Sequence, residues 1–392
     1  MGGGYRADRL VRVQWTPPRS CHPDKSGLDR LAVVTEIEPI PAELTDAVAE
    51  ILDSFIDDKQ RQLAPIGAEL YQLVDAARRA VHGGKRLRPA FAYWGWRAAG
   101  GPVDATQEII TAAAAIELVH ASALAHDDVM DDSDTRRGQP AAHRAFSKRL
   151  RLAETARVDA ERFGRSAAIL LGDLLLSWSD ELLGRSGFKP KVIVRGRVYF
   201  DLLRTEVVAG QFLDVLAQAG GTTSASEALR VVRYKSAKYT VERPLQFGAA
   251  LANAEPPLLA ALSSYGVPLG EAFQLRDDVL GVFGEPRLTG KPSGDDIREG
   301  KRTLLVARAF AKSSSRQRAV LDRSFARAEI DAAGVAAVQQ VIRDTGALEA
   351  VETVITELTA ASLAALERAP IVDGDARAAL RVLTDRVTNR SL

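Results

Sequence analysis

The chain has 392 residues, 46% of them hydrophobic, so it carries enough apolar side chains to bury a large core. Its 52 basic and 51 acidic residues leave a formal net charge of +1, which excludes a global field that would attract nucleic acid or an anionic membrane. The single cysteine, Cys21, excludes an intrachain disulfide and fits a reducing cytoplasm, and we expect neither a signal peptide nor a transmembrane segment.

Residues 1–41 predict a poorly ordered extension, because they contain Gly2–Gly4 and Pro17–Pro18 and show no sustained hydrophobic period. From Ala42 onward, apolar residues recur at helical spacing, and runs such as Thr111–Ala125 are rich in Ala and Leu without a breaker. No window alternates polar with apolar residues over six or more positions. Short apolar windows such as Ile169–Leu176 are typical of buried core helices. Residues 42–392 therefore predict a single all-α domain.

A basic segment, Gly83–Pro89, is the first cluster with a chemical signature. Lys85 and Arg88 are three residues apart, so they share a face of one helical turn and, with Gly84, can form a metal-free site for an anionic group. A basic turn alone is usually just solvated. This one becomes informative only in company with acidic clusters.

The strongest signal is the run His126–Gly138, in which five carboxylates occur within eight residues directly after an apolar helix. Asp127 and Asp131 are four residues apart and share a helix face, where they repel each other unless a hard cation such as Mg²⁺ lies between them. Asp128 points about 100° away from Asp127 and is suited to a bridging role. A solvated acidic helix end is the alternative interpretation, and the apolar character of the preceding helix weighs against it.

A second acid pair, Asp277 and Asp278, ends another apolar helix 150 residues downstream of Asp127. Two such helix ends, facing each other, would let divalent cations bridge carboxylates to a shared polyanion, with basic side chains on its remaining oxygens. Cations follow both acid clusters closely: Arg136, Arg137, Lys291 and Lys301.

These clusters, in this order, resemble the trans-isoprenyl diphosphate synthase (polyprenyl synthetase) family, and within it the geranylgeranyl diphosphate synthases most. The resemblance runs from about residue 45 to residue 385 and includes Gly210–Asp214, Lys235-Ser236 and Phe273–Asp278. It implies an all-α isoprenoid-synthase bundle around a central active-site cavity, usually in a homodimer. It also implies a Mg²⁺-dependent condensation of an allylic diphosphate (dimethylallyl, geranyl or farnesyl diphosphate) with isopentenyl diphosphate.

The resemblance further implies roles for the matching residues. Roughly two to three Mg²⁺ ions would bridge the allylic diphosphate, held by Asp127, Asp128, Asp131, Asp277 and Asp278. The allylic diphosphate and its surroundings would be contacted by Arg136, Lys235, Ser236, Gln274, Lys291 and Lys301. Isopentenyl diphosphate would be bound by Gly84, Lys85, Arg88, His120 and Arg137. Catalysis would depend on the five aspartates with Lys235 and Gln274. A buried structural histidine is the alternative interpretation of His120.

Two positions depart from the family pattern. The second acid motif would normally be DDxxD, but its fifth position is Gly281, which removes one carboxylate and predicts weaker metal binding there without loss of function. The usual Lys-Thr pair is Lys235-Ser236, which keeps the hydroxyl.

Product length is a steric prediction. Residues four and five before Asp127 are Ala123 and Ser122, both small, and the next turns present Val119 and Ile116. In the family, bulky aromatic residues here stop the prenyl tail at the farnesyl length, so the small residues predict a longer product, geranylgeranyl diphosphate. A farnesyl or longer polyprenyl product is the alternative, and so is helix packing as the only role of these residues.

Three other functions stay open. A terpene cyclase also uses an Asp-rich motif on an all-α fold, but it needs no second diphosphate site such as Gly84-Lys85-Arg88. A head-to-head synthase would carry DxxxD pairs on both walls. A weakly active or regulatory subunit of a prenyltransferase is favoured only by Gly281.

Overall fold

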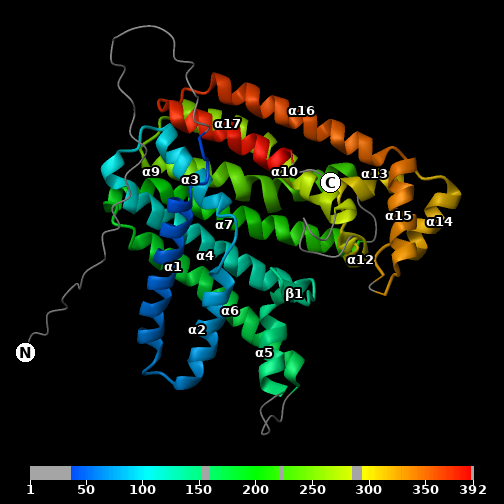
Figure 1. The fold of residues 1–392 in the computed structure, drawn as a ribbon, viewed down its shortest axis with the longest axis horizontal. Helices are drawn as coiled ribbons and strands as arrows, with labels where there is room; N and C mark the ends of the chain where they lie inside the picture. The colour runs from blue at the N-terminus through cyan, green and yellow to red at the C-terminus, as the bar shows by residue number, and fades with distance from the viewer. Residues whose placement is uncertain (1–36, 152–158, 221–223, 285–293, 328, 390–392) are drawn as a thin grey trace, which may run out of the picture.

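The computed structural model describes residues 37–151, 159–220, 224–284, 294–327 and 329–389 (Figure 1). Within these ranges the chain is helical, which confirms the predicted fold class. The strands found there are β1 (Thr135–Arg136) and β2 (Gln139–Pro140), which pair antiparallel and close the acidic run after Met130 as a tight hairpin.

The N-terminal half of the chain forms the helices α1 to α7, with short 3₁₀ turns at Ala68–Leu70 and Val103–Ala105. Its helices are α1 (Ala42–Leu63), α2 (Tyr71–Val81), α3 (Leu87–Ala98), α4 (Thr106–Met130), α5 (Ala142–Arg151), α6 (Ala160–Gly184) and α7 (Pro190–Ala219). The C-terminal half adds α8 (Ala225–Val231), the π-helix η3 (Val232–Glu242), α9 (Arg243–Leu251), α10 (Pro256–Phe283), α12 (Asp295–Glu299), α13 (Leu304–Lys312), α14 (Ser315–Ser324), α15 (Ala332–Asp344), α16 (Ala347–Arg368) and α17 (Gly374–Thr388).

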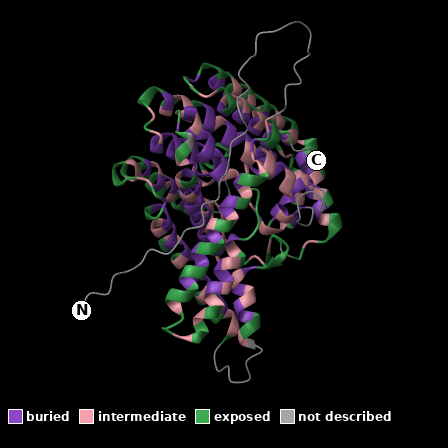
Figure 2. Cartoon of the chain, turned by 60° about the vertical axis from the view of Figure 1, so that its left-hand side comes forward, coloured by how far each residue is buried: buried purple, intermediate pink, exposed green. Residues whose placement is uncertain are grey.

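Helices α3 and α9 form the centre of the main core. Every residue of α9 is buried, and so is the run Pro89–Trp96 of α3, as expected for helices that are apolar on all sides. Around them, α4 packs on α3 and α6, α7 packs on α9 and η3, and α10 packs on η3 and α16. Figure 2 shows the buried residues concentrated in the middle of the bundle and the exposed ones on its outer faces and tips. A second apolar cluster joins α13 and α15 to the ends of α10 and α16.

Two glycines set the close approach of α3 and α9. A Cβ atom on Gly95 would lie 2.1 Å from the carbonyl oxygen of Leu245, and one on Gly248 would lie 1.8 Å from the carbonyl oxygen of Ala92. Real Cβ atoms do not approach backbone this closely, so the two helices pack backbone to backbone only because both positions lack a side chain.

Gly248→Ala is therefore expected to destabilise the fold by about 1–3 kcal/mol, because the added methyl group forces α3 and α9 apart. Urea unfolding followed by circular dichroism measures the change. Gly184→Ala is the matched control, since its Cβ would meet nothing within 4 Å and the residue is exposed at the end of α6. Equal unfolding midpoints for the two variants would contradict the packing argument.

Helix α4 is a long apolar helix of the core. It is the one helix in the described ranges that is long and apolar enough to cross a membrane, with a mean hydropathy of 1.5, but 72% of that window is buried inside the fold. Burial by α3 and α6 accounts for its composition. It is the core helix that carries the first acid cluster at its C-terminal end, and its apolar window is longer than the Ile169–Leu176 window noted in the sequence.

The described chain begins with a segment that packs on the bundle. Helix α1 starts at Ala42, where the domain boundary was predicted, but the five residues before it are already attached. The indole Nε1 of Trp94 donates to the carbonyl oxygen of Pro39 at 2.6 Å, and Arg386 donates to both carboxylate oxygens of Glu38 at 2.6 and 2.7 Å. Residues 1–36 of the predicted extension lie outside the described residues.

The π-helix η3 was not expected from the sequence, which predicts only helix there. Glycines on the neighbouring helices make room for it. A Cβ atom on Gly210 of α7 would lie 2.3 Å from the backbone nitrogen of Lys235, and one on Gly270 of α10 would lie 2.5 Å from the Cα of Ala237. The wider π-helix thus fits between α7 and α10, and π-helical turns are frequent at functional sites.

Candidate active site

One cavity of about 1460 Å³ brings the predicted clusters together. Its walls come mainly from α3, α4, α7, η3, α10, α12 and the end of α17, which lie far apart along the chain. Asp127 and Asp277 both line it. The two acid-ended helices therefore converge on a single compartment, which the prediction of a shared polyanion requires.

Most of the predicted site residues lie on the wall of this cavity, on segments from α3 to the residues just after α12. They are Lys85, Arg88, His120, Ala123, Asp127, Arg136, Lys235, Ser236, Gln274, Asp277, Asp278 and Lys301. Lys291 lies outside the described residues.

Seven of the other predicted residues do not line the cavity. Asp128, Asp131, Gly84 and Arg137 do not line the cavity, although each adjoins a residue that does or a neighbour of one. The chain-length residues divide in the same way. Ala123 is on the wall, whereas Ile116, Val119 and Ser122 are 0, 2 and 3% exposed and pack into the core. The prediction that these three face the growing tail is not supported by their positions, because only the face of α4 that carries Ala123 and Asp127 is open.

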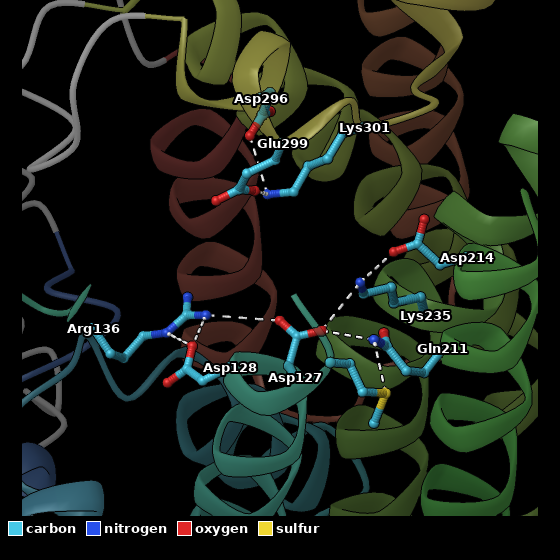
Figure 3. Close-up of polar contacts among 10 residues, drawn as sticks. Asp127, Asp128, Arg136, Gln211, Asp214, Lys235, Asp296, Glu299 and Lys301 are labelled. Atoms are coloured by element: carbon cyan, nitrogen blue, oxygen red, sulfur yellow. Dashed lines mark hydrogen bonds and ion pairs between the residues drawn. The ribbon is translucent and has the colours of Figure 1, made fainter. Parts of the chain in front are cut away.

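Asp127 is the centre of a hydrogen-bonded group at the end of α4 (Figure 3). Its Oδ1 accepts from Gln211 Nε2 at 2.7 Å and lies 3.4 Å from Lys235 Nζ, and Lys235 also donates to Asp214 at 2.6 Å. Burial lowers the pKa of Lys235, but Asp127 and Asp214 more than offset this and raise that pKa above its usual value. A lysine held fully charged between two carboxylates is suited to a polyanionic ligand.

Asp128 is paired with Arg136 rather than pointed into the cavity. The guanidinium donates to Asp128 Oδ1 through both Nε, at 2.8 Å, and Nη2, while Nη2 lies 3.7 Å from Asp127. Burial raises the pKa of Asp128, although the hydrogen bonds from Arg136 act in the opposite direction. In this structure Asp128 holds Arg136 at the cavity wall, and its part in metal binding stays a prediction.

Asp131 follows α4 directly and completes the first acid group. Burial and the neighbouring charge of Asp127 raise the pKa of Asp131 to about 6. The two carboxylates are four residues apart, as the sequence predicts, and their mutual repulsion is the kind that a divalent cation relieves.

The opposite wall carries the second acid pair at the end of α10. Gln274 Nε2 donates to Asp278 Oδ1 at 2.8 Å, and burial raises the pKa of Asp278 to about 7. Beyond α12, Lys301 Nζ lies 3.1 Å from Asp296 and 2.8 Å from Glu299. In Figure 3 this lysine and its two acids lie opposite the Asp127 group. Each wall thus combines carboxylates with one half-buried lysine.

A third group, with basic and aromatic residues, lies at the α3 end of the cavity. Arg88 Nη2 donates to Thr240 Oγ1 at 3.0 Å, and its guanidinium lies 4.4 Å from the centre of the Tyr239 ring. The hydroxyl of Tyr239 is 3.2 Å from Nδ1 of His120. Burial, with the nearby Arg88, holds the pKa of His120 well below its usual range, so the imidazole is neutral and acts as a hydrogen-bonding group.

The other basic residues near this end have different partners. Arg86 is buried and pairs with Glu117 at 2.6 Å, so it supports α4 rather than the cavity. Arg137 Nη1 donates to the carbonyl oxygen of His82 at 2.8 Å. A Cβ atom on Gly84 would lie 2.8 Å from the Arg137 guanidinium, so Gly84 makes room for that side chain.

Several cavity residues were not singled out from the sequence. Gln211 and Asp214 belong to the matching stretch Gly210–Asp214 but were given no role in the site. They are three apart and share a face of α7, and this pattern of two polar residues in an apolar run is the signal that could have assigned them one. Tyr239 and Thr240 gave no such signal, because their positions depend on the π-helix. Asp296 stands beside Asp295 in the sequence, and only the fold distinguishes the two.

The donor set fits a hard cation that also takes oxygens from a ligand. Within the described ranges, no three His, Cys, Asp or Glu side chains converge closely enough to hold a metal by themselves. Mg²⁺ is usually bound by one or two carboxylates together with water and substrate phosphates. Carboxylates on two walls, with lysines between them, match that mode of binding.

Comparisons with known proteins give the family. The polyprenyl synthetase family model matches residues 71–343. The chain belongs to the polyprenyl synthetase family. Its members are prenyltransferases that condense an allylic diphosphate with isopentenyl diphosphate, so the predicted family, enzyme class and reaction are confirmed.

Individual members of the polyprenyl synthetase family resemble the chain along most of its length. A crystal structure of geranylgeranyl pyrophosphate synthase from Corynebacterium glutamicum, complexed with isoprenyl diphosphate and magnesium, has a TM-score of 0.85 and 41% identity, covering 89% of this chain and 99% of that one. Geranylgeranyl diphosphate synthase of Mycobacterium tuberculosis is 34% identical over 70% of this chain and 75% of its own length. Geranylfarnesyl diphosphate synthase of Aeropyrum pernix is 32% identical, over 79% and 91%.

Proposed function

We propose that this chain is a Mg²⁺-dependent geranylgeranyl diphosphate synthase. The observation that carries the proposal is one cavity lined by both acid-ended helices, two half-buried lysines and a separate basic group at Arg88. A cavity with one metal-assisted polyanion site and one metal-free site fits two diphosphate substrates. The similar structures and relatives named above include several geranylgeranyl diphosphate synthases.

Asp127 and Asp131 on one wall, with Asp277 and Asp278 on the other, are the residues we assign to roughly two to three Mg²⁺ ions. When bound, the ions neutralise the allylic diphosphate and make it a good leaving group. A magnesium-bound structure is known for the similar Corynebacterium enzyme. Burial, together with the repulsion from Asp127, raises the pKa of Asp131 to about 6, and this repulsion supports a cation between the two carboxylates.

The chain's own cations and dipoles serve the reaction in two ways. Arg136, Lys235 and Lys301 bind the diphosphate oxygens and stabilise the negative charge that builds up as the C–O bond breaks. Ser236, the carbonyl oxygen of Gln274 and the backbone carbonyls of the π-helix supply dipoles for the allylic cation. The double bond of isopentenyl diphosphate then forms the new C–C bond, and the proton lost from that substrate goes to the departing diphosphate.

Isopentenyl diphosphate is assigned to the Arg88 end of the cavity. Lys85 and Arg88 line it, and neutral His120 adds a hydrogen-bonding group without a charge. Arg88 is held in place by Thr240 and the Tyr239 ring, so its guanidinium is already oriented before a ligand binds. Gly84 and Arg137 complete this end from the rim.

Arg88→Ala is expected to raise the KM for isopentenyl diphosphate by about 10–100-fold, because a charged hydrogen bond contributes about 1.5–3 kcal/mol. The KM for the allylic substrate should change by less than about threefold, since that substrate binds at the other group. Steady-state kinetics with each substrate varied in turn measure both values. Arg88→Lys, which keeps the charge, should recover part of the loss. If the KM for the allylic substrate rises more than the KM for isopentenyl diphosphate, the allylic substrate binds at the Arg88 end instead.

A homodimer is supported by an apolar face on α6 and α7. Large hydrophobic side chains that do not line the cavity are exposed there along both helices: Phe163, Ile169, Leu170, Val194, Val198 and Leu216. A face of this kind on a monomer marks an interaction surface. We propose that a second copy of the chain covers it, which sedimentation velocity at micromolar concentration would check. A cytoplasmic location is supported by the single cysteine of the chain.

One assay tests the function directly. The purified chain alone is incubated with Mg²⁺, radiolabelled isopentenyl diphosphate and dimethylallyl, geranyl or farnesyl diphosphate, and the products are separated by chromatography. Geranylgeranyl diphosphate is the expected main product with all three primers. No turnover without a partner chain would favour the regulatory subunit, and a main product of another length would overturn the geranylgeranyl assignment.

A further inference from the structure

We propose that Asp296, on the short helix α12, supplies the carboxylate that Gly281 lacks in the second acid motif. The functional acid group of that wall is then Asp277, Asp278 and Asp296, drawn from two helices. This inference rests on the proposed function, because it assigns Asp296 to the same diphosphate and Mg²⁺ site.

The geometry at Gly281 is the first argument. Gly281 lies four residues after Asp277 on α10, so a side chain there would emerge on the same face as that acid. A Cβ atom on Gly281 would lie 2.0 Å from Oδ2 and 2.5 Å from Cγ of Asp296. The carboxylate of Asp296 therefore already occupies the space that a side chain of residue 281 would need. Gly281 and Asp296 both line the cavity.

The packing of helix α12, which carries Asp296, is the second argument. Helix α12 begins after Gly294 and ends before Gly300, and both glycines have left-handed backbones, with φ of 74° and 73°. Between them, Ile297 is fully buried in the second apolar cluster, and its carbonyl oxygen accepts from the backbone nitrogen of Ala326 at 3.0 Å. These contacts fix α12 against α10. Asp296, only 8% exposed, is therefore held beside Gly281 by packing.

The charge around Asp296 is the third argument. Lys301 Nζ lies 3.1 Å from Oδ1, and Oδ2 is the oxygen beside Gly281. Lys301 also lies 2.8 Å from Glu299, so it keeps a partner when a ligand competes for Asp296. The same pairing of a carboxylate with a lysine occurs at Asp127 and Lys235 on the opposite wall. The two walls thus present matched sets of groups to a diphosphate between them.

Substitutions at residue 281 of the second acid motif are expected to test the role of Asp296. Restoring the family pattern by Gly281→Asp alone should weaken the site, because the new side chain collides with Asp296. Moving the carboxylate from α12 to α10 with the double variant Gly281→Asp/Asp296→Ala should restore it. Asp296→Asn keeps the volume of the side chain and removes only its charge.

The experiment measures binding of inorganic pyrophosphate in the presence of Mg²⁺ by isothermal titration calorimetry on the full chain. Asp296→Asn and Gly281→Asp are each expected to weaken binding by about tenfold or more, and the double variant should return to within about threefold of the wild type. Asp322→Asn, which removes an exposed acid of α14, controls for the loss of one negative charge. Unfolding midpoints without ligand separate an effect on the site from an effect on the fold.

The outcomes are distinct. Wild-type affinity in Asp296→Asn, or a double variant as weak as the Gly281→Asp variant, would overturn the role of Asp296. A lower unfolding midpoint with unchanged affinity would show that Asp296 only braces Lys301, which also overturns it. If the wild type itself does not bind pyrophosphate with Mg²⁺, the proposed function fails, and that result is separate from any difference among the variants.

Discussion

Asp127→Asn is expected to lower kcat by about 10³-fold, equivalent to about 4 kcal/mol of transition-state stabilisation. Asp127 contacts Gln211, lies beside Lys235 and is the nearer acid of the first cluster to the cavity. An asparagine still accepts the hydrogen bond from Gln211, so the fold of this wall is kept. It cannot neutralise a divalent cation, so the leaving group departs with its charge poorly balanced.

Single-turnover kinetics at saturating Mg²⁺ and substrates measure this loss, and thermal unfolding checks that the variant folds. Asp134→Asn is the matched control, since Asp134 belongs to the same acidic run but is exposed and pairs with Arg144. Its kcat should stay within about twofold, because exposed ion pairs contribute little. A kcat for Asp127→Asn within tenfold of the wild type would remove Asp127 from the centre of the mechanism.

The sequence could predict those features that depend on short stretches of chain. The helical runs follow from apolar spacing, and each acid pair is readable because it directly follows an apolar run. The sequence predicts that Asp127 and Asp277 line one cavity, because both acid pairs would need a shared polyanion. The spacing of 150 residues does not itself set the distance between them. That step came from the resemblance to the family and from electrostatic reasoning.

Other features depend on tertiary contacts that no local pattern contains. The pairing of Asp128 with Arg136 depends on the hairpin after α4, which brings the arginine back to the helix end. The position of Asp296 depends on the packing of α12 beside Gly281. The missing carboxylate at residue 281 does not indicate, in the sequence, which other side chain lies there. The π-helix could not be predicted from the sequence either, because apolar spacing does not distinguish a π-helix from an α-helix.

The chain-length residues show the same limit on α4. Successive residues turn by about 100°, so neighbours of Ala123 in sequence point in other directions. Ser122 and Val119 are consequently packed in the core, while Ala123 and Leu124 line the cavity. The steric prediction thus narrows to one position of the four.

Ala123→Phe is expected to change the main product from geranylgeranyl to farnesyl diphosphate. Ala123 is half-buried on the cavity wall, four residues before Asp127, and Val208 and Phe212 of α7 line the same cavity. A phenyl ring at position 123 extends into the cavity and fills the path of a tail that has passed the diphosphate, because the core behind α4 is close-packed and cannot take it up. Elongation should therefore stop one unit earlier, while the first condensation keeps its rate to within about threefold.

Chromatography of the dephosphorylated products, with dimethylallyl diphosphate as primer, measures the change. Ala123→Leu should give a mixture, because its side chain is shorter and flexible. Ser122→Ala is the matched control, since a buried neighbour that does not line the cavity should leave the product distribution unchanged. An unaltered product from Ala123→Phe would mean that the tail descends along another helix, and the cavity wall formed by α7 would then be the next place to introduce bulk.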